Sequence, residues 1–167
     1  MSISQDRLEE ILRHARQKHG AGQDALIPTL AEINEALGSI PAEALEELAR
    51  AGRHAAETAP LSASQINGVA TFYSMFSTET LGRHVVRFCE SAPCHVVGGR
   101  QVLEALQKNL RLNPGQTSAD GQWSLLSVSC LGLCSVGPVF LVDEDVYGNV
   151  TPENVPEILA KYREEQP

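Results

Sequence analysis

RFCESAPCHVVGG (residues 87–99) and SVSCLGLCSVGP (residues 127–138) are the two stretches that decide the fold of this chain. They contain every cysteine of the 167-residue sequence, namely Cys89, Cys94, Cys130 and Cys134. Each pair closes a short loop, so little chain entropy is lost when its two sulfurs come together. Two tight pairs separated by a helix-length spacer predict a site that is held between two loops.

The spacer and its flanks have the pattern of a strand, a helix and a second strand. HVVRF (residues 84–88) is a β-rich run that ends at Cys89, and residues 123–128 form a second strand that leads to Cys130. Between them lies a helical stripe, made of Val102, Leu103, Leu106 and Leu110. Such a unit requires a right-handed crossover and a parallel strand pair. Both cysteine pairs then start at the carboxyl ends of neighbouring strands, the edge where open α/β sheets build their sites.

The rest of the second half predicts further strands and a last helix. Residues 139–142 and 146–150 are expected to form a hairpin, with residues 143–145 at its turn. Thr151 is expected to cap the last helix, with Pro152 at its first position. Residues 81–167 are therefore predicted to be an open sheet covered by helices.

Residues 1–80 predict a small helical bundle. Apolar residues recur at three- and four-residue spacing over residues 4–19, which indicates a first helix. A second helix, capped by Asp24, should end at Gly38, and a third should begin at Pro41. Residues 52–60 have the character of a loop or a fraying helix end.

A fourth helix has the strongest start signal in the chain. Ser62 and Gln65 fit a capping box. Further along, Phe72, Tyr73 and Phe76 are expected to pack in the core of the bundle. The predicted fold class is thus α+β, with a helical bundle ahead of a sheet domain.

Composition excludes several classes of function. With 21 acidic and 13 basic side chains the net charge is −8, which argues against a duplex nucleic-acid partner. No apolar run approaches the length that crosses a bilayer, and the polar, acidic amino terminus lacks the features of a secretory signal. We therefore expect a reducing cytoplasm, where cysteine clusters are more often metal sites than disulfides.

Four kinds of chemistry compete for the cysteines. A thioredoxin-like redox pair requires Cys-x-x-Cys, whereas the spacings here are Cys-x4-Cys and Cys-x3-Cys. Disulfides are disfavoured by the compartment. Structural zinc suits four thiolates and is the serious rival, although zinc sites mostly use tighter spacing. A [2Fe–2S] cluster needs two sulfurs on each of two irons, and two separate pairs meet that need.

The surroundings of the cysteines suit an anionic cluster. Gly98, Gly99, Gly132 and Gly137 would let backbone amides approach the sulfurs. Glu90, and the turn at residues 143–145 if it folds nearby, would make reduction harder. His95 is expected to be an exposed loop histidine and not a ligand, because a Rieske-type site needs two histidines in place of two cysteines.

At these residues the chain resembles the family of the 24-kDa subunit of respiratory complex I, a type that also occurs in NAD-linked and electron-bifurcating hydrogenases and in NAD-dependent formate dehydrogenases. The motifs that carry the resemblance are GVATFYSMF (residues 68–76), GRHVVRFCESAPCHVVGG (residues 82–99), CLGLCSVGP (residues 130–138) and DEDVYGNVTPENVPEIL (residues 143–159). The likeness extends to the helical part, DALIPTLAEINEALGSIP (residues 24–41).

The resemblance implies a thioredoxin-like ferredoxin domain over residues 81–167 behind an amino-terminal bundle over residues 1–80. It implies one [2Fe–2S] cluster whose ligands are Cys89, Cys94, Cys130 and Cys134. The usual partner in that family is a larger, 51-kDa-type subunit that carries FMN, the NAD(P)(H) site and a further iron–sulfur cluster.

The expected function is one-electron transfer inside a flavin and iron–sulfur oxidoreductase complex, with no substrate site on this chain. Cluster and flavin would exchange single electrons. We expect a cytoplasmic location, at most at the cytoplasmic face of a membrane complex. The alternative is a binding or scaffold module that four cysteines staple around zinc, without redox activity. Quinone reduction, hydrogen turnover and formate oxidation all remain open as the activity of the whole complex.

Overall fold

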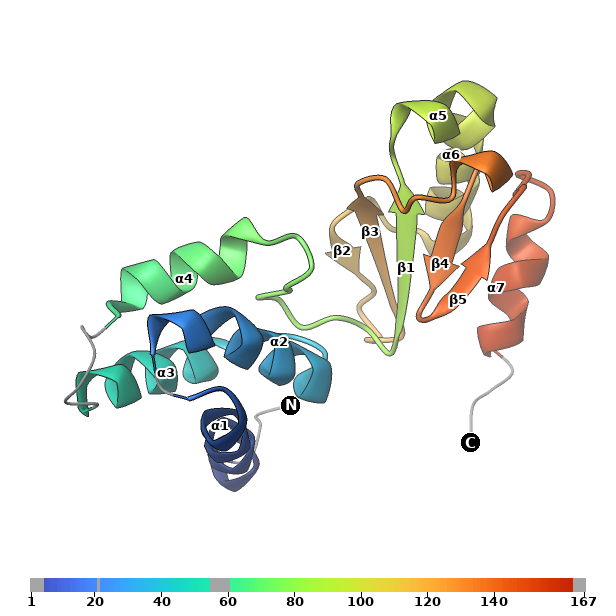
Figure 1. Ribbon diagram of the computed structural model, residues 1–167. Helices are drawn as coiled ribbons and strands as arrows, with labels where there is room; N and C mark the ends of the chain where they lie inside the picture. Colours follow the sequence, from blue (N-terminus) through green and yellow to red (C-terminus); the bar gives the residue numbers. More distant parts are fainter. Residues whose placement is uncertain (1–4, 21, 55–60, 164–167) are drawn as a thin grey trace. The chain divides into compact units, whose positions relative to one another are not determined.

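The computed structural model describes residues 5–20, 22–54 and 61–163 (Figure 1). The chain divides into two compact units, Met1–Thr80 and Leu81–Pro167. The first consists of helices, and the second contains a five-stranded sheet, so the α+β class is confirmed. Within the described ranges, no helix has both the length and the apolar content needed to cross a membrane.

In the described residues of the first unit, the α-helices are α1 (Gln5–His19), α2 (Leu26–Leu37), α3 (Ala42–His54) and α4 (Ala63–Phe72). Their buried apolar side chains form one core around Leu30, Ile33, Ile40 and Ile66. The end of α2 at Gly38 is confirmed, because this glycine has a left-handed φ of 74° and donates its amide to the Asn34 carbonyl at 2.8 Å. Helix α3 runs to His54, and residues 55–60 of the expected loop lie outside the described residues.

Two predicted helix starts in this unit have different outcomes. The capping box of α4 is confirmed: the Gln65 amide donates to Ser62 Oγ at 3.2 Å, and the Ser62 amide donates to Gln65 Oε1 at 2.9 Å. The cap at Asp24 is wrong. Asp24 lies inside a 3-10 turn, η1 (Gln23–Ala25), and α2 begins after Ala25 without a side-chain cap.

The prediction that Phe72 and Tyr73 pack in the core is also wrong. Phe72 is 79% exposed and Tyr73 36% exposed, and of the three aromatic residues only Phe76 is buried. For Tyr73 the physical reason is that α4 ends at Phe72, after which Tyr73 takes an extended backbone with ψ of 114°; Phe72 lies inside the helix, and its exposure has no such explanation. Helical spacing therefore stops before it reaches Tyr73.

The second unit is a mixed sheet with the strand order β2-β3-β1-β4-β5. Its strands are β1 (His84–Cys89), β2 (Gln116–Thr117), β3 (Trp123–Val128), β4 (Phe140–Val142) and β5 (Asp145–Tyr147). As predicted, β1 and β3 are parallel, and their register pairs His84 with Trp123 and Cys89 with Val128. Both strands therefore end at the same edge of the sheet.

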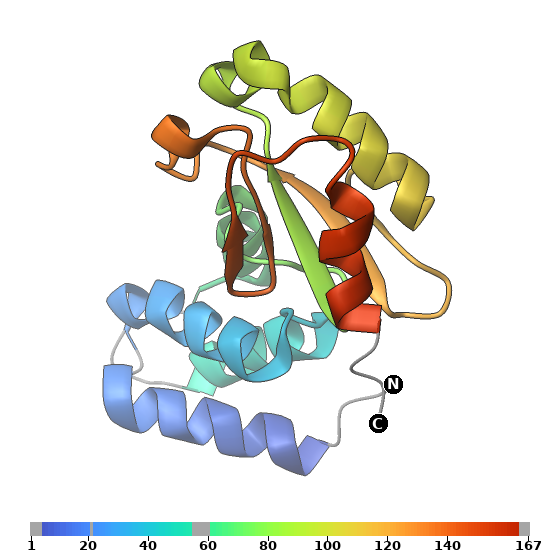
Figure 2. The same cartoon turned by 90° about the vertical axis from the view of Figure 1, so that its right-hand side faces the viewer.

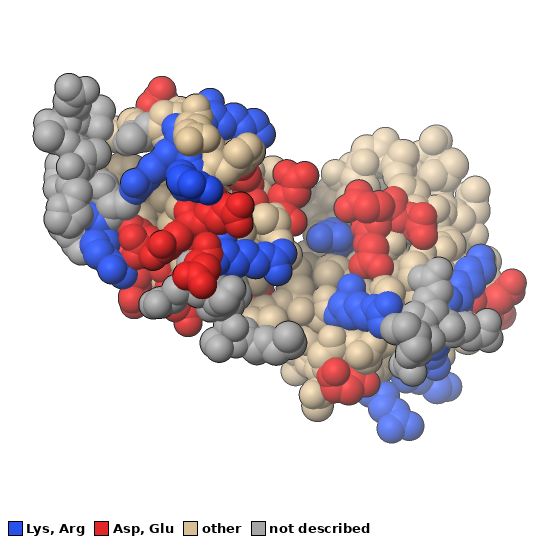
Figure 3. All heavy atoms as spheres, turned by 90° about the horizontal axis from the view of Figure 1, so that it is seen from below, with Lys and Arg blue, Asp and Glu red and all other residues tan. Residues whose placement is uncertain are grey.

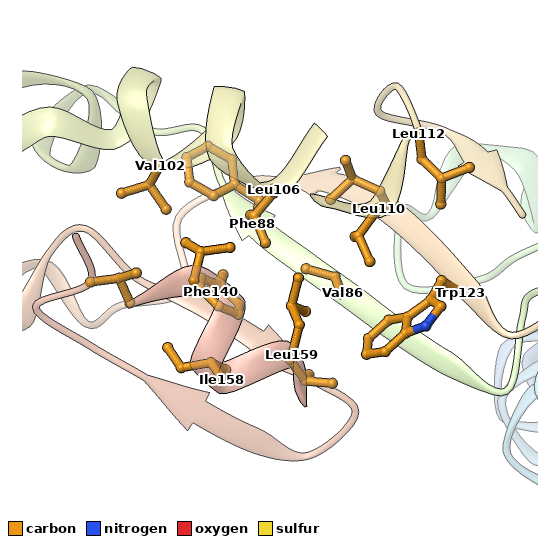
Figure 4. Close-up of a cluster of buried hydrophobic side chains, with 14 residues drawn as sticks. Val86, Phe88, Val102, Leu106, Leu110, Leu112, Trp123, Phe140, Ile158 and Leu159 are labelled. Carbon is orange, nitrogen blue, oxygen red and sulfur yellow. The ribbon is translucent and has the colours of Figure 1, made fainter. Parts of the chain in front are cut away.

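Helices α6 (Arg100–Leu110) and α7 (Val155–Arg163) contribute to one core with the sheet. Alternate residues of β1, Val86 and Phe88, point into this core (Figure 4). They meet Leu106 from α6 and Leu159 from α7, both fully buried. Figure 2 shows the two helices on the same side of the sheet.

The hairpin of β4 and β5 is confirmed, but two boundaries near it differ from the prediction. Strand β5 stops at Tyr147 and not at residue 150, because Asn149 has a left-handed φ of 52° that turns the chain. The last helix begins at Val155, since the Thr151 amide bonds the Asn154 side chain in a preceding turn. Pro156 then lies in the first helical turn, where a backbone N–H has no intrahelical carbonyl to bond, so the N–H that proline lacks costs the helix no hydrogen bond.

Candidate metal centre

Strand geometry brings both cysteine pairs to one edge of the sheet. Strand β1 ends at Cys89 itself, whereas β3 ends at Val128, two residues before Cys130. The Cys89 amide donates to the Val139 carbonyl at 3.3 Å, which ties the first ligand loop to the segment after the second pair. Beyond β1, the short helix α5 (Ala92–Cys94) turns the chain so that Cys94 faces back toward Cys89.

The sulfurs meet as two pairs. The Cys130 and Cys134 Sγ atoms are 3.5 Å apart, and the thiols of Cys89 and Cys94 are hydrogen-bonded to each other. Two thiolates on one tetrahedral ion, with metal–sulfur bonds of about 2.3 Å, stand about 3.8 Å apart. All four cysteines are free of disulfides. Each pair therefore has the separation that suits two ligands of one iron.

One zinc ion and a diiron cluster place different requirements on the four sulfurs. In the parts of the chain that the structure describes, which include all four cysteines, no group of three or more His, Cys, Asp or Glu residues could hold one metal ion. A zinc site made of four cysteines requires all four sulfurs around one centre. A diiron cluster requires two ligands at each of two centres.

The two pairs differ in burial. Cys89 and Cys94 are each 1% exposed and pack with Val139, while Cys130 and Cys134 are exposed. Leu131 and Leu133 pack, partly buried, against the first pair. The site is thus closed on the side of the first pair and open on the side of the second.

Backbone amides are aimed at the sulfurs. The Gly132 amide donates to Cys130 Sγ at 3.4 Å, and the left-handed φ of 79° at Gly132 makes this approach possible. Burial by itself would raise the pKa of Cys89, but hydrogen bonds from the Leu131 and Ser91 backbones outweigh it, and the pKa is lowered. These donors favour a thiolate, which is the form that binds metal.

The second member of each pair is harder to ionise. Burial, followed by the hydrogen bond with Cys89, raises the pKa of Cys94. The hydrogen bond with Cys130, followed by burial, raises the pKa of Cys134. Paired thiols at this distance therefore keep protons when no cation is present, and metal binding must release them.

Two glycines allow the loops to close around the sulfurs. A Cβ on Gly99 would lie 2.7 Å from the Cys94 carbonyl oxygen. A Cβ on Gly137 would lie 3.2 Å from Val97 Cγ2 and 3.4 Å from Cys94 Sγ. The loops after the first and second pairs thus touch at positions that leave little room for a side chain.

The other residues singled out in the sequence have simpler roles. His95 is exposed, and the Glu90 carboxylate accepts a hydrogen bond from the Ser127 hydroxyl. The condition under which residues 143–145 were expected to make reduction harder is not met, because this turn lies at the opposite end of β1, where Asp143 Oδ2 is 2.8 Å from His84 Nδ1.

Sequence reasoning missed the donors that the structure aims at Cys89. The Leu131 amide comes from the other loop, 42 residues further along the chain (131 − 89). Nothing in a residue's identity marks its amide as a donor to sulfur. The glycine content of the loops was the one available signal, and it identified Gly132 correctly.

Comparisons with known proteins complete this description. The family model of thioredoxin-like [2Fe-2S] ferredoxins matches residues 9–163. The E subunit of NADH-quinone oxidoreductase from Salmonella typhimurium is 37% identical over 154 residues, which are 92% of this chain and 89% of that protein. The protein of the same name from Aquifex aeolicus is 35% identical over 140 residues, or 84% of this chain and 83% of that protein.

A solved structure shares the fold. A chain of NAD+-reducing [NiFe]-hydrogenase in the air-oxidized state matches with a TM-score of 0.66 and 24% identity. The match covers 83% of this chain but 23% of the hydrogenase chain. At that identity the likeness shows the fold alone.

Proposed function

The chain belongs to the family of thioredoxin-like [2Fe-2S] ferredoxins, and from this premise we propose that Cys89, Cys94, Cys130 and Cys134 are the ligands of its cluster. Membership establishes an electron-transfer protein with one [2Fe–2S] cluster. The observation that carries the ligand assignment is the meeting of two thiol pairs at one sheet edge, with 3.5 Å between the sulfurs of the second pair. Cys89 and Cys94 would hold one iron, and Cys130 and Cys134 the other.

When bound, the cluster supplies one-electron chemistry. The chain's own part is to hold and insulate it. The buried Cys89 and Cys94 keep water from one side, and the Leu131, Ser91 and Gly132 amides offset negative charge on the sulfurs. Amide donors of this kind make the reduced state easier to reach.

The chain would serve as a subunit of an NAD(P)H-linked oxidoreductase. Relatives named as E subunits of NADH-quinone oxidoreductase, matched over most of both chains, support this proposal. The partner would be a 51-kDa-type subunit with FMN and an NAD(P)(H) site, and the cluster would lie near enough to the flavin to exchange single electrons. Such an assembly would function in the cytoplasm or at the cytoplasmic face of a membrane.

Anaerobic purification of the full chain tests the ligand assignment. We expect two irons and two acid-labile sulfides per chain, which is the composition of a [2Fe–2S] cluster, and an EPR signal after reduction. Cys89→Ser and Cys130→Ser should each lose the cluster or change its EPR spectrum, whereas Ser135→Ala should not. One zinc per chain without sulfide would overturn the proposal in favour of a redox-inert scaffold.

A further inference from the structure

The two cysteine pairs differ in how easily a molecule in solution can reach them. Cys130 and Cys134 are exposed, with their Sγ atoms 3.5 Å apart. Cys89 and Cys94 are each 1% exposed and pack with the fully buried Val139. Thiol chemistry requires access to the sulfur as well as a reactive form of it. In a chain that has not yet received a cluster, a thiol reagent can therefore attack the second pair much more easily than the first.

The loop between Cys130 and Cys134 can bring their sulfurs to bonding distance. A disulfide bond is about 2.05 Å long, so the two Sγ atoms, now 3.5 Å apart, have to approach by about 1.5 Å. Gly132, at the middle of the loop, has a left-handed φ of 79°, which turns the chain back on itself. A Cβ on Gly132 would meet no heavy atom within 4 Å, so the loop has open space in which to make this movement.

The surroundings of the second pair carry little charge that would repel an anionic oxidant. Residues 89–99 and 129–139 contain one formally charged side chain, Glu90, although the chain has a net charge of −8. The Glu90 carboxylate accepts a hydrogen bond from the Ser127 hydroxyl. Acidic and basic side chains of the second unit are visible at its end away from α5, which Figure 3 shows from below. Charges that far from the sulfurs are largely screened at physiological salt.

We propose that Cys130 and Cys134 form a reversible disulfide in the chain without its cluster, with a low-molecular-weight disulfide such as glutathione disulfide as the oxidant. One cysteine sulfur bonds to a sulfur of the oxidant, whose S–S bond breaks, and the thiol proton leaves with the released small thiol. The other cysteine then displaces the second half of the oxidant in the same way. One protein disulfide and two small thiols result, and the oxidant gains the two electrons that the cysteine pair loses.

This disulfide would act as a redox gate on cluster insertion. The gate rests on the proposed ligand assignment, because a [2Fe–2S] cluster needs two thiolates at each iron. With the second pair oxidised, only Cys89 and Cys94 remain as ligands. In reducing compartments most disulfides are transient or redox-sensing, and exposed ones are the more readily reduced. Cluster loading would therefore follow the thiol redox state of the compartment.

Timed oxidation of the full chain tests which pair reacts. The cluster is removed anaerobically with a chelator and dithiothreitol, both reagents are removed, and the fluorescence of the buried Trp123 is used to check the fold. Glutathione disulfide is then added, and samples are denatured in iodoacetamide, digested and analysed by mass spectrometry. The Cys130–Cys134 disulfide should form roughly tenfold faster or more than a Cys89–Cys94 disulfide, because the first pair reacts only when its loops open locally.

Two cysteine variants and the cluster-loaded chain are the controls. Cys134→Ser should leave Cys130 as a mixed disulfide with glutathione, because the second displacement has no attacking sulfur. Cys94→Ser is the matched variant of the first pair and should leave the rate of Cys130–Cys134 oxidation unchanged. The cluster-loaded chain should form no disulfide over the same period, since its sulfurs are bound to iron.

Cluster transfer to the oxidised chain tests the gate itself. The donor is a scaffold protein loaded with a [2Fe–2S] cluster, used without free thiol, and uptake is followed by visible absorption and EPR. The oxidised chain should take up no cluster until dithiothreitol reopens the disulfide, whereas the reduced chain should take it up directly.

The gate and the proposed function fail in different ways. Equal oxidation of both pairs, as an unfolded chain would show, would overturn the gate. So would a disulfide between the pairs, mixed disulfides alone in the unchanged chain, or cluster uptake by the oxidised chain, and in each of these cases the proposed function stands. If the reduced chain takes up no cluster either, the ligand assignment fails and the gate falls with it.

Discussion

Replacing Gly99 with alanine tests how tightly the first cysteine loop closes. Gly99 has φ of −56° and ψ of −33°, which alanine adopts without strain. Its Cβ, however, would lie 2.7 Å from the Cys94 carbonyl oxygen and 3.0 Å from the carbonyl carbon. These are backbone atoms, which cannot rotate away as a side chain can. The segment that carries Cys94 would therefore have to move.

The magnitude follows from two opposing effects. Alanine is about 1 kcal/mol more favourable than glycine inside a helix. Overpacking a well-filled site costs about 1–3 kcal/mol, and a clash with backbone belongs in the upper half of that range. We expect Gly99→Ala to lower the free energy of unfolding of the second unit by about 1–2 kcal/mol. The displaced Cys94 should also lower the iron content per chain.

Tryptophan fluorescence during chemical denaturation measures this effect in the right unit. Trp123 is the single tryptophan of the chain and lies in the core of the second unit. Gly68→Ala is the control, because Gly68 lies within α4 and its Cβ would meet no heavy atom within 4 Å. That change should stabilise the first unit by about 0.5–1 kcal/mol, followed by circular dichroism. A Gly99→Ala chain with unchanged stability and full iron would refute the reasoning.

Three further changes have expected outcomes. Leu106→Ala, at a fully buried position, should cost about 2–5 kcal/mol of unfolding free energy, measured by Trp123 fluorescence. Gly132→Ala should cost about 1 kcal/mol for the left-handed φ of 79° and shift the EPR spectrum of the cluster, because the amide bonded to Cys130 moves. Hydrogen bonding, chiefly with His14, lowers the pKa of Glu32 below its ordinary value of 4.5. The ionised carboxylate therefore stabilises the first unit above that pH, and this stabilisation is lost as the pH falls through the lowered pKa. Glu32→Gln should therefore weaken the first unit at neutral pH but not in strong acid, as thermal melts by circular dichroism would show.

Local patterns predicted the elements that depend on neighbours in sequence. The parallel pair of β1 and β3 followed from a strand, a helical stripe and a second strand, and the chain folds that way because the crossover has one favoured hand. The capping box at Ser62 and Gln65 was equally local, since both hydrogen bonds join residues three apart.

Predictions failed where a pattern was extended beyond the structure that supports it. Tyr73 continues the apolar spacing of α4 but follows the end of the helix, so it is not on the helical face. Pro152 has the sequence context of a first helical residue, yet a turn closed by the Asn154 side chain comes first. In both cases the sequence pattern is compatible with a longer helix than the one that forms.

In the candidate site, too, some features were predictable from the sequence and others were not. Spacing was enough to predict that the two cysteine pairs would meet, because both follow strands whose order the crossover fixes. The contrast between the closed first pair and the open second pair was not predictable, since it depends on how Val139 and the two leucines of the second loop pack. The hydrogen-bond donors to sulfur were also not predictable from the sequence, because they are backbone amides whose positions depend on the dihedral angles of the loops.

The core and the cysteine edge are specified by the same register. In β1, Val86 and Phe88 face the helices, so Val85, Arg87 and Cys89 alternate to the other face. A slip of one residue against β3 would expose Val86 and Phe88 and would move Cys89 away from the loop that follows Val128. The hydrophobic energy of this core therefore selects the pairing that brings Cys89 toward Leu131. Mutations deep in this core should consequently lower cluster content as well as stability, while equally destabilising mutations in the first unit should leave the cluster in place.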